Sequence, residues 1–166
     1  MHKVILNLDD LVLETVRKGS RFEARTADCF GTQLGLSGLG ATLYEVPPGK
    51  TACPFHRHHT CDEMFFILSG TGTYRYGEQR LAVRAGDCLA APAGAEAHQI
   101  INTGTEALRY LAVSNNTNAD VVEYPDGGRV RIDVGATGYH RDNATFAAGG
   151  RLVPQGYWDG EQIDDC

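Results

Sequence analysis

The sequence predicts an all-β protein whose strands form a sandwich or a barrel. Glycine and proline divide the middle of the chain into short apolar segments that recur about every 8 to 12 residues, which is the strand spacing of such folds. The 20 glycines among 166 residues exceed the usual share of about 7% and stand singly between these segments. Residues 73–83 alternate in polarity around Gly77, as expected for a hairpin with one solvated face.

Each expected element follows from the local pattern. A helical periodicity is confined to Leu8–Arg17, within an N-terminal extension of residues 1–39, and it lacks a C-cap. Seven strands are expected next: Ala41–Val46, Met64–Leu68, Gly72–Tyr76, Gln79–Val83, Asp87–Ala91, Ala97–Asn102 and Leu108–Val113. The polar, glycine-rich C-terminal extension, residues 114–166, is interpreted as part of the fold. Its Trp158 is expected to anchor it on the barrel or on a partner subunit.

The composition disfavours several classes of protein. Fifteen Lys and Arg against 21 Asp and Glu give a formal net charge of −6, so we expect no nucleic acid partner. The longest apolar run, Met64–Leu68, is far shorter than the roughly 18 residues of a membrane span, so we expect no membrane partner. The first residues lack the apolar stretch of a secretion signal, and the five cysteines are odd in number. Both features favour a cytoplasmic protein with reduced thiols.

Four of the six histidines fall in two short windows. His56 and His58 point to the same face of an extended chain, while Arg57 points to the other, because side chains alternate along a strand. Glu63 opens the most apolar predicted strand, where an inward carboxylate needs a cationic partner. His98 begins another strand after a Pro-Gly turn and supplies a third imidazole. A divalent metal would supply the compensating charge, so the pattern predicts a metal site.

The first window resembles the first motif of the cupin superfamily. His56-x-His58 is followed after four residues by Glu63 and after six more by Gly70, as that motif requires. The lead from Gly49 to His56 is one residue longer than in the usual motif. This departure is an insertion in a turn.

The second window resembles the second cupin motif. Gly86 is followed after five residues by Pro92-x-Gly94 and then by His98 and Asn102. Three residues separate Gly94 from His98 where the usual motif has two. This departure also falls in a turn.

The resemblance covers about residues 40–113. It implies a single cupin domain over residues 1–166, with a double-stranded β-helix, or jelly-roll barrel, flanked by the two extensions. It also implies that the barrel holds one divalent transition metal, Mn, Fe, Zn, Co or Ni, on His56, His58, Glu63 and His98. The end of the chain resembles a group of small bacterial cupins, some of which are named sugar-phosphate isomerases by analogy.

Strand alternation predicts the walls of the pocket. Residues that share a face with Glu63 or His98 turn inward with them. We expect a largely apolar cavity lined by Phe65, Ile67, Ile100 and Asn102. The side chain of Asn102 is either a polar contact in that cavity or a brace for the turn at residues 102–104.

Four neighbours of the ligands receive other roles. His59 is expected on the surface, or in support of a ligand imidazole. Asp62 is expected to face solvent or to accept a loop hydrogen bond. Cys53 and Cys61 are expected to be buried as small apolar side chains rather than to bind the metal as thiolates.

Three functions fit the pattern. The first is an isomerase that acts on a small oxygenated molecule, such as a sugar or sugar phosphate, by metal polarisation of a carbonyl. It requires an acid or base, and for a phosphate an inward Arg or Lys, that the sequence does not identify; Arg57 points away, and the direction of Arg75 is open. The second is a metal-dependent dioxygenase, and the third a non-catalytic protein that binds a small-molecule ligand. A homodimer is expected because most soluble oligomers are symmetric.

Overall fold

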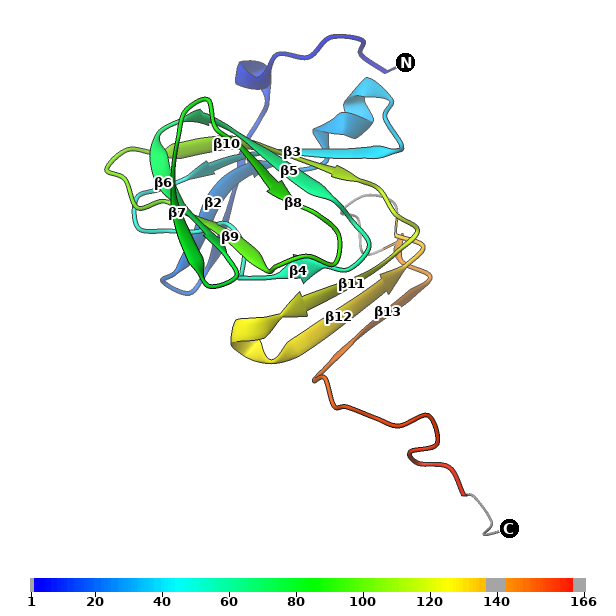
Figure 1. Ribbon diagram of the computed structural model, residues 1–166. Coiled ribbons are helices and arrows are strands. Elements are labelled where there is room, and N and C mark those ends of the chain that lie inside the picture. Colours follow the sequence, from blue (N-terminus) through cyan, green and yellow to red (C-terminus); the bar gives the residue numbers. More distant parts are fainter. Residues whose placement is uncertain (1, 137–142, 163–166) are drawn as a thin grey trace.

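Antiparallel β-sheets face each other and form the walls of a barrel (Figure 1). This computed structural model describes residues 2–136 and 143–162. One wall is a six-stranded sheet in the order β1-β2-β3-β10-β5-β8. The other wall combines a three-stranded sheet, β7-β6-β9, with a four-stranded sheet, β13-β12-β11-β4. The strands are β1 (Glu14–Lys18), β2 (Phe22–Ala27), β3 (Leu39–Val46), β4 (Arg57–His58), β5 (Glu63–Ser69), β6 (Thr71–Tyr76), β7 (Gln79–Arg84), β8 (Cys88–Ala91), β9 (His98–Ile101), β10 (Leu108–Asn115), β11 (Ala119–Tyr124), β12 (Arg129–Val134) and β13 (Phe146–Gly150).

The all-β class and the seven strands expected from the sequence are confirmed. Each observed boundary lies within two residues of its expected position, β3 and β10 being the most extended. The hairpin of residues 73–83 is β6 and β7, which pair from Thr71↔Arg84 to Tyr76↔Gln79 around a turn in which Gly77 has a φ of +54°. That left-handed conformation explains why glycine stands there.

The helical periodicity at Leu8–Arg17 does not produce a helix over this stretch. Only Leu8–Asp10 forms a helical turn, the 3-10 helix η1, and Glu14–Lys18 is strand β1, paired with β2. Thr15 and Val16 are β-branched and suit a strand better than a helix, and pairing with β2 decides the outcome. Two further 3-10 turns, η2 (Phe30–Leu34) and η3 (Pro125–Gly127), complete the helical content of the described residues. Because these turns have three to five residues, none could cross a membrane.

The C-terminal extension adds three strands that the sequence did not predict. Strands β11, β12 and β13 form a meander whose first strand pairs with the two-residue strand β4. The chain after Gly150 then leads away from the barrel (Figure 1). Trp158 is 60% exposed, and its ring packs edge-on against Tyr157 at 4.7 Å. Trp158 therefore does not pack on the barrel of its own chain, and the alternative, packing on a partner subunit, stays a prediction.

The core fills the space between the walls. Its fully buried members include Val46 on β3 and Leu108 on β10, and both have an exposed fraction of 0%. Cys61 and Cys88 are free thiols among the described residues, and Cys166 lies outside them. Tight packing of this kind makes side-chain truncation costly.

Truncation of Leu108 tests the core. Leu108→Ala is expected to lower the free energy of unfolding by about 2 to 5 kcal/mol, because it removes buried methyl groups and leaves a cavity. Leu81→Ala is the matched control, since Leu81 on β7 is 45% exposed, and it should cost less than about 1 kcal/mol. Urea denaturation followed by circular dichroism measures both. Equal losses in the two variants would contradict the assigned core.

Candidate metal centre

Two backbone hydrogen bonds join His56 and His98. The His56 N–H donates to the His98 carbonyl at 3.1 Å, and the His98 N–H donates to the His56 carbonyl at 2.7 Å. This antiparallel bridge links the edge strands β9 and β4 and so unites the two small sheets into one wall. Opposed residues of an antiparallel pair place their side chains on the same face. The two imidazoles consequently lie close together, with ring centroids 4.6 Å apart.

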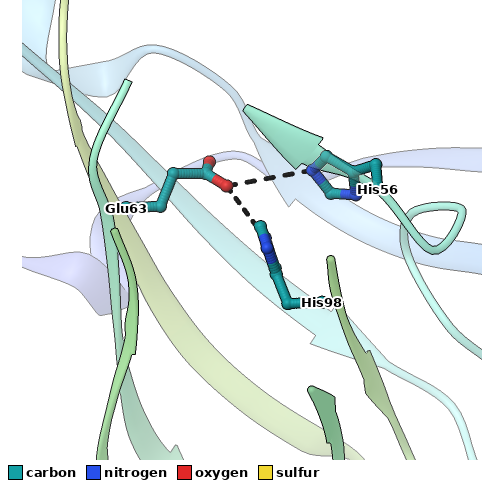
Figure 2. A group of neighbouring side chains, drawn as sticks. All are labelled: His56, Glu63 and His98. Atoms are coloured by element: carbon teal, nitrogen blue, oxygen red, sulfur yellow. Dashed lines mark hydrogen bonds and ion pairs between the residues drawn. The ribbon is translucent and has the colours of Figure 1, made fainter. Parts of the chain in front are cut away.

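The carboxylate of Glu63 reaches these imidazoles from the opposite wall. Glu63 is the first residue of β5, in the six-stranded sheet, and only 7% of it is exposed. Its Oε2 lies 3.0 Å from Nε2 of His98 and 3.8 Å from Nε2 of His56 (Figure 2). Nε2 of His58 lies 3.5 Å from the same oxygen. The structure thus brings together all four side chains that the two motifs single out.

Carbonyl and carboxylate oxygens orient two of the imidazoles. The Nδ1 atom of His56 lies 2.7 Å from the carbonyl oxygen of Pro54, and Nδ1 of His58 is hydrogen-bonded to the carboxylate of Asp120. An imidazole that donates from Nδ1 presents Nε2 as its free lone pair. Both Nε2 atoms therefore point to the region of the Glu63 carboxylate. His98 Nδ1 is buried and has no hydrogen-bond partner among the described residues.

The protonation of the cluster follows from burial and mutual contact. Burial lowers the pKa of His56 to about 4, and the neighbouring His98 acts in the same direction. Burial opposes ionisation of Glu63, but the hydrogen bond from His98 and the charge of His58 hold the pKa of Glu63 at about 2. Burial also disfavours a charged His58, yet its bonds to Asp120 and Cys61 raise its pKa to about 10. Without a metal ion, the cluster therefore pairs an anionic Glu63 with a cationic His58, and the proton on Nε2 of His58 must leave before this nitrogen can bind a metal.

The donors suit a divalent transition metal: ligand atoms of His56, Glu63 and His98 lie within 4.8 Å of one another, and His58, which groups with Cys61 and Asp120, adds a nitrogen 3.5 Å from the Glu63 oxygen. Ligand atoms at about 2.0 to 2.2 Å from one ion, the range known for zinc, lie about 3 Å apart when they occupy neighbouring positions. The 3.0 to 3.8 Å separations between the Glu63 oxygen and the three imidazole nitrogens are close to this value. Three imidazoles and one carboxylate suit Mn, Fe, Co, Ni or Zn and leave positions for small oxygen ligands on an octahedral ion.

A cavity of about 240 Å³ lies beside the four side chains. Both walls of the barrel contribute to its lining, which is Tyr44, Cys53, Pro54, His56, His58, Glu63, Phe65, His98, Ile100, Tyr110, Ala112 and Tyr124. Phe65 and Ile100 belong to this lining. Ile67 does not line the cavity, although it packs in the same hydrophobic core as Phe65 and Ile100. The cavity is mainly apolar, and three tyrosines belong to its lining.

Asn102 serves the turn beside β9. Its amide NH2 donates to the carbonyls of Val46 at 2.7 Å and Glu106 at 2.8 Å, and its Oδ1 accepts from the N–H of Gly104 at 2.9 Å. The residue is fully buried, and these bonds engage both ends of its amide. Of the two roles considered for Asn102, the structure shows the brace of the turn.

Three tyrosines give the cavity its aromatic wall. Tyr44 and Tyr110 stack with ring centroids 5.0 Å apart, and burial raises the pKa of Tyr110 well above its usual value. Its hydroxyl thus stays protonated and can act only as a hydrogen-bond donor or acceptor. Tyr124, at the end of β11, stacks on His56 with centroids 6.2 Å apart. Alternation alone did not reveal Tyr124, since β11 was not predicted.

The remaining polar neighbours take supporting positions. His59 Nε2 lies 3.3 Å from the carboxylate of Glu123, outside the four-residue cluster. Asp62 accepts a loop hydrogen bond from the N–H of Ala93 at 2.8 Å, as expected. Cys61 lies on the Nδ1 side of His58, where its Sγ is 3.0 Å from the Thr117 hydroxyl.

Asp120 is a further site residue that sequence analysis missed. It follows His58 by 62 residues, and the pairing of β11 with β4 brings the two together. The other Asp120 oxygen accepts from the N–H and the hydroxyl of Thr60 at 3.2 and 2.9 Å, which fixes the carboxylate. A carboxylate held in this way orients a ligand imidazole.

Comparison with known proteins agrees with this geometry. Residues 42–114 match the cupin domain. The chain contains a cupin domain. The oxalate-binding protein of Thermotoga maritima is 35% identical over 69 residues, which are 42% of this chain and 55% of that protein. The chain spans only 50 to 62% of the length of the curated relatives that it matches.

Solved structures share the cupin fold beyond the conserved barrel. A sugar phosphate isomerase of the cupin superfamily from Silicibacter pomeroyi superposes with a TM-score of 0.72 at 22% identity, over 96% of each chain. A protein from Acidithiobacillus ferrooxidans, provisionally named a sugar phosphate isomerase, has a TM-score of 0.75 at 24% identity, over 92% of this chain and 98% of the other. Likeness at this identity establishes the fold, and the expected cupin barrel is confirmed.

Removal of the Asp120 carboxylate tests its orienting role. Asp120→Asn is expected to weaken the binding of Zn²⁺ by about 10- to 100-fold, because the His58 ring loses the acceptor that fixes it. Competition with a chromophoric chelator gives the dissociation constants. Asp126→Asn is the matched control, since it removes the same charge from η3 without touching a candidate ligand. A change of less than twofold for Asp120→Asn, or an equal loss in the control, would contradict the role.

Proposed function

We propose that this cupin is a metal-dependent enzyme that isomerises a small oxygenated molecule, a sugar or sugar phosphate. One divalent transition metal would be bound by His56, His58, Glu63 and His98. The convergence of three imidazole nitrogens on one buried carboxylate oxygen, beside a cavity of about 240 Å³, is the observation that carries the proposal. When bound, the metal supplies polarisation of a substrate carbonyl.

Tyr110 supplies one of the groups that such a reaction needs. An aldose–ketose isomerisation moves hydrogen between neighbouring carbons and consumes no co-reactant, so the site needs only orientation and proton transfer. The protonated hydroxyl of Tyr110 can donate a hydrogen bond to a substrate oxygen in the cavity. Two solved structures that this chain covers over almost their whole length are named sugar phosphate isomerases, one of them provisionally, and these names support this class of substrate.

Ligand binding without catalysis is the second candidate. Among the described residues that line the cavity, Glu63 is the only acidic residue, and there is no lysine or arginine. A lining that is poor in free acid–base groups favours a binding site. The likeness to an oxalate-binding protein supports this candidate as well.

Metal analysis followed by an isomerase assay tests the proposal. Untagged protein purified without chelator is expected to carry about one transition metal per chain, whereas His58→Ala and His98→Ala should lose it and keep their β-type circular dichroism. The metal-loaded protein should then convert five- or six-carbon aldoses, or their phosphates, to ketoses, as followed by 13C NMR, and both variants should not. Leu81→Ala serves as a surface control.

The outcomes separate the candidates. Stoichiometric metal in both histidine variants would contradict the ligand assignment. Bound metal without conversion of any sugar would favour the binding protein, and iron with oxygen consumption would favour the dioxygenase. Absence of metal after reconstitution would leave the four side chains as pocket residues only.

We also propose that the protein forms a homodimer and works in the cytoplasm. The exposed rings of Tyr157 and Trp158 offer apolar surface that a second copy can bury. The free thiols of Cys61 and Cys88 fit a reducing compartment. Sedimentation equilibrium at micromolar concentration should give a mass near twice 18.0 kDa, and a mass of 18.0 kDa would contradict the dimer.

A further inference from the structure

The two arginines nearest the first motif are already engaged. Arg57 is bound by Glu123, with its Nε 2.7 Å from Oε2. Arg75 donates two hydrogen bonds to Asp126, at 2.7 and 2.9 Å, and lies over the ring of Phe55. Neither guanidinium is therefore available to bind an anion at the cavity.

Arg129 lies near the cavity on the four-stranded sheet. It is the first residue of β12 and pairs directly with Tyr124 on β11, so both side chains lie on the same face. The guanidinium carbon lies 4.1 Å from the centroid of the Tyr124 ring. Tyr124 in turn lines the cavity, with its ring 6.2 Å from that of His56. The Arg129 charge is thus no more than about 10 Å from a candidate metal ligand.

Arg129 also lines a hollow of about 550 Å³ on the β12–β13 hairpin. Its lining includes three arginines, and the small residues of β13 leave room between them. Arg131 is occupied, because its Nε lies 2.9 Å from both oxygens of Asp133. Within residues 2–136 and 143–162, no carboxylate lies within 4.0 Å of the guanidinium nitrogens of Arg129 or Arg151. Both arginines retain donors for an external acceptor.

We propose that Arg129 and Arg151 form an anion-binding site that holds the phosphate or carboxylate group of the ligand whose other end enters the metal cavity. The paired N–H donors of a guanidinium match both kinds of oxyanion. In a chain with a net charge of −6, a local pair of uncompensated arginines also attracts the anion that the rest of the surface repels. The inference rests on the proposed function, since it identifies that ligand as an anion.

Titration of the full chain with inorganic phosphate tests the site directly. Isothermal calorimetry on metal-free protein, at constant ionic strength in chloride, should detect phosphate binding. Arg129→Ala and Arg151→Ala should each weaken it at least about tenfold, because each removes charge-assisted hydrogen bonds. Arg129→Lys should recover part of the affinity, because a lysine retains the charge but lacks the guanidinium fork.

Arg84→Ala is the matched control. Arg84 is exposed on β7 and contributes nothing to the hollow, so its loss removes the same charge from another strand. Equal weakening in this control would show a general charge effect and overturn the proposal. A wild-type protein that does not bind phosphate would overturn it as well. A parallel titration with acetate shows whether the site favours phosphate or carboxylate.

Two further outcomes keep the inference separate from the proposed function. Phosphate binding that depends on Arg129 in a protein with no isomerase activity would support the anion site and reject the isomerase. If Arg129→Ala instead changes the sedimentation mass and phosphate has no effect, the hollow is a contact between copies and the anion site is rejected. Circular dichroism of each variant verifies that the barrel is retained.

Discussion

Burial of the Glu63 carboxylate is the constraint on which the centre of this cupin depends. An isolated charge with so little exposure would be strongly destabilising, and the group stays ionised because imidazoles surround it. Those imidazoles come from the opposite wall of the barrel, so the charge is compensated only when the two walls have come together. Closure of the barrel and assembly of the candidate metal centre are consequently the same structural event.

The short strand β4 depends on its neighbours for its position. Two residues make too few ladder hydrogen bonds to be stable alone, and β4 is held by β11 on one side and by the bridge between His56 and His98 on the other. Acidic side chains of β11 strengthen this support, because Asp120 binds His58 and Glu123 binds Arg57, the two residues of β4. The C-terminal extension thus acts as the outer brace of the first motif.

Local sequence patterns predicted the seven central strands and the clustering of the motif side chains, because both depend on residues that are close in the sequence. The spacing of the two motifs identified the four clustered side chains, and alternation placed Phe65 and Ile100 at the cavity. The helix expected at Leu8–Arg17 failed because pairing with β2 outweighs weak local propensity. Asp120 and Tyr124 lie on a polar strand far from the motifs, and only long-range pairing shows what they contact. A pattern of residues along the chain carries no signal for such pairs.

Tyr124 connects the two halves of the proposed ligand site. One neighbour of its ring is His56, inside the barrel, and the other is Arg129, on the hairpin outside it. Cations favour the faces of aromatic rings, so the tyrosine both seals the cavity wall and holds the guanidinium beside it. In the proposed site, a ligand that reaches from the cavity to Arg129 would lie next to this ring, and its length would have to match the distance between the two. On this proposal, recognition would depend on the extension as much as on the conserved barrel, so that the same barrel could serve different ligands.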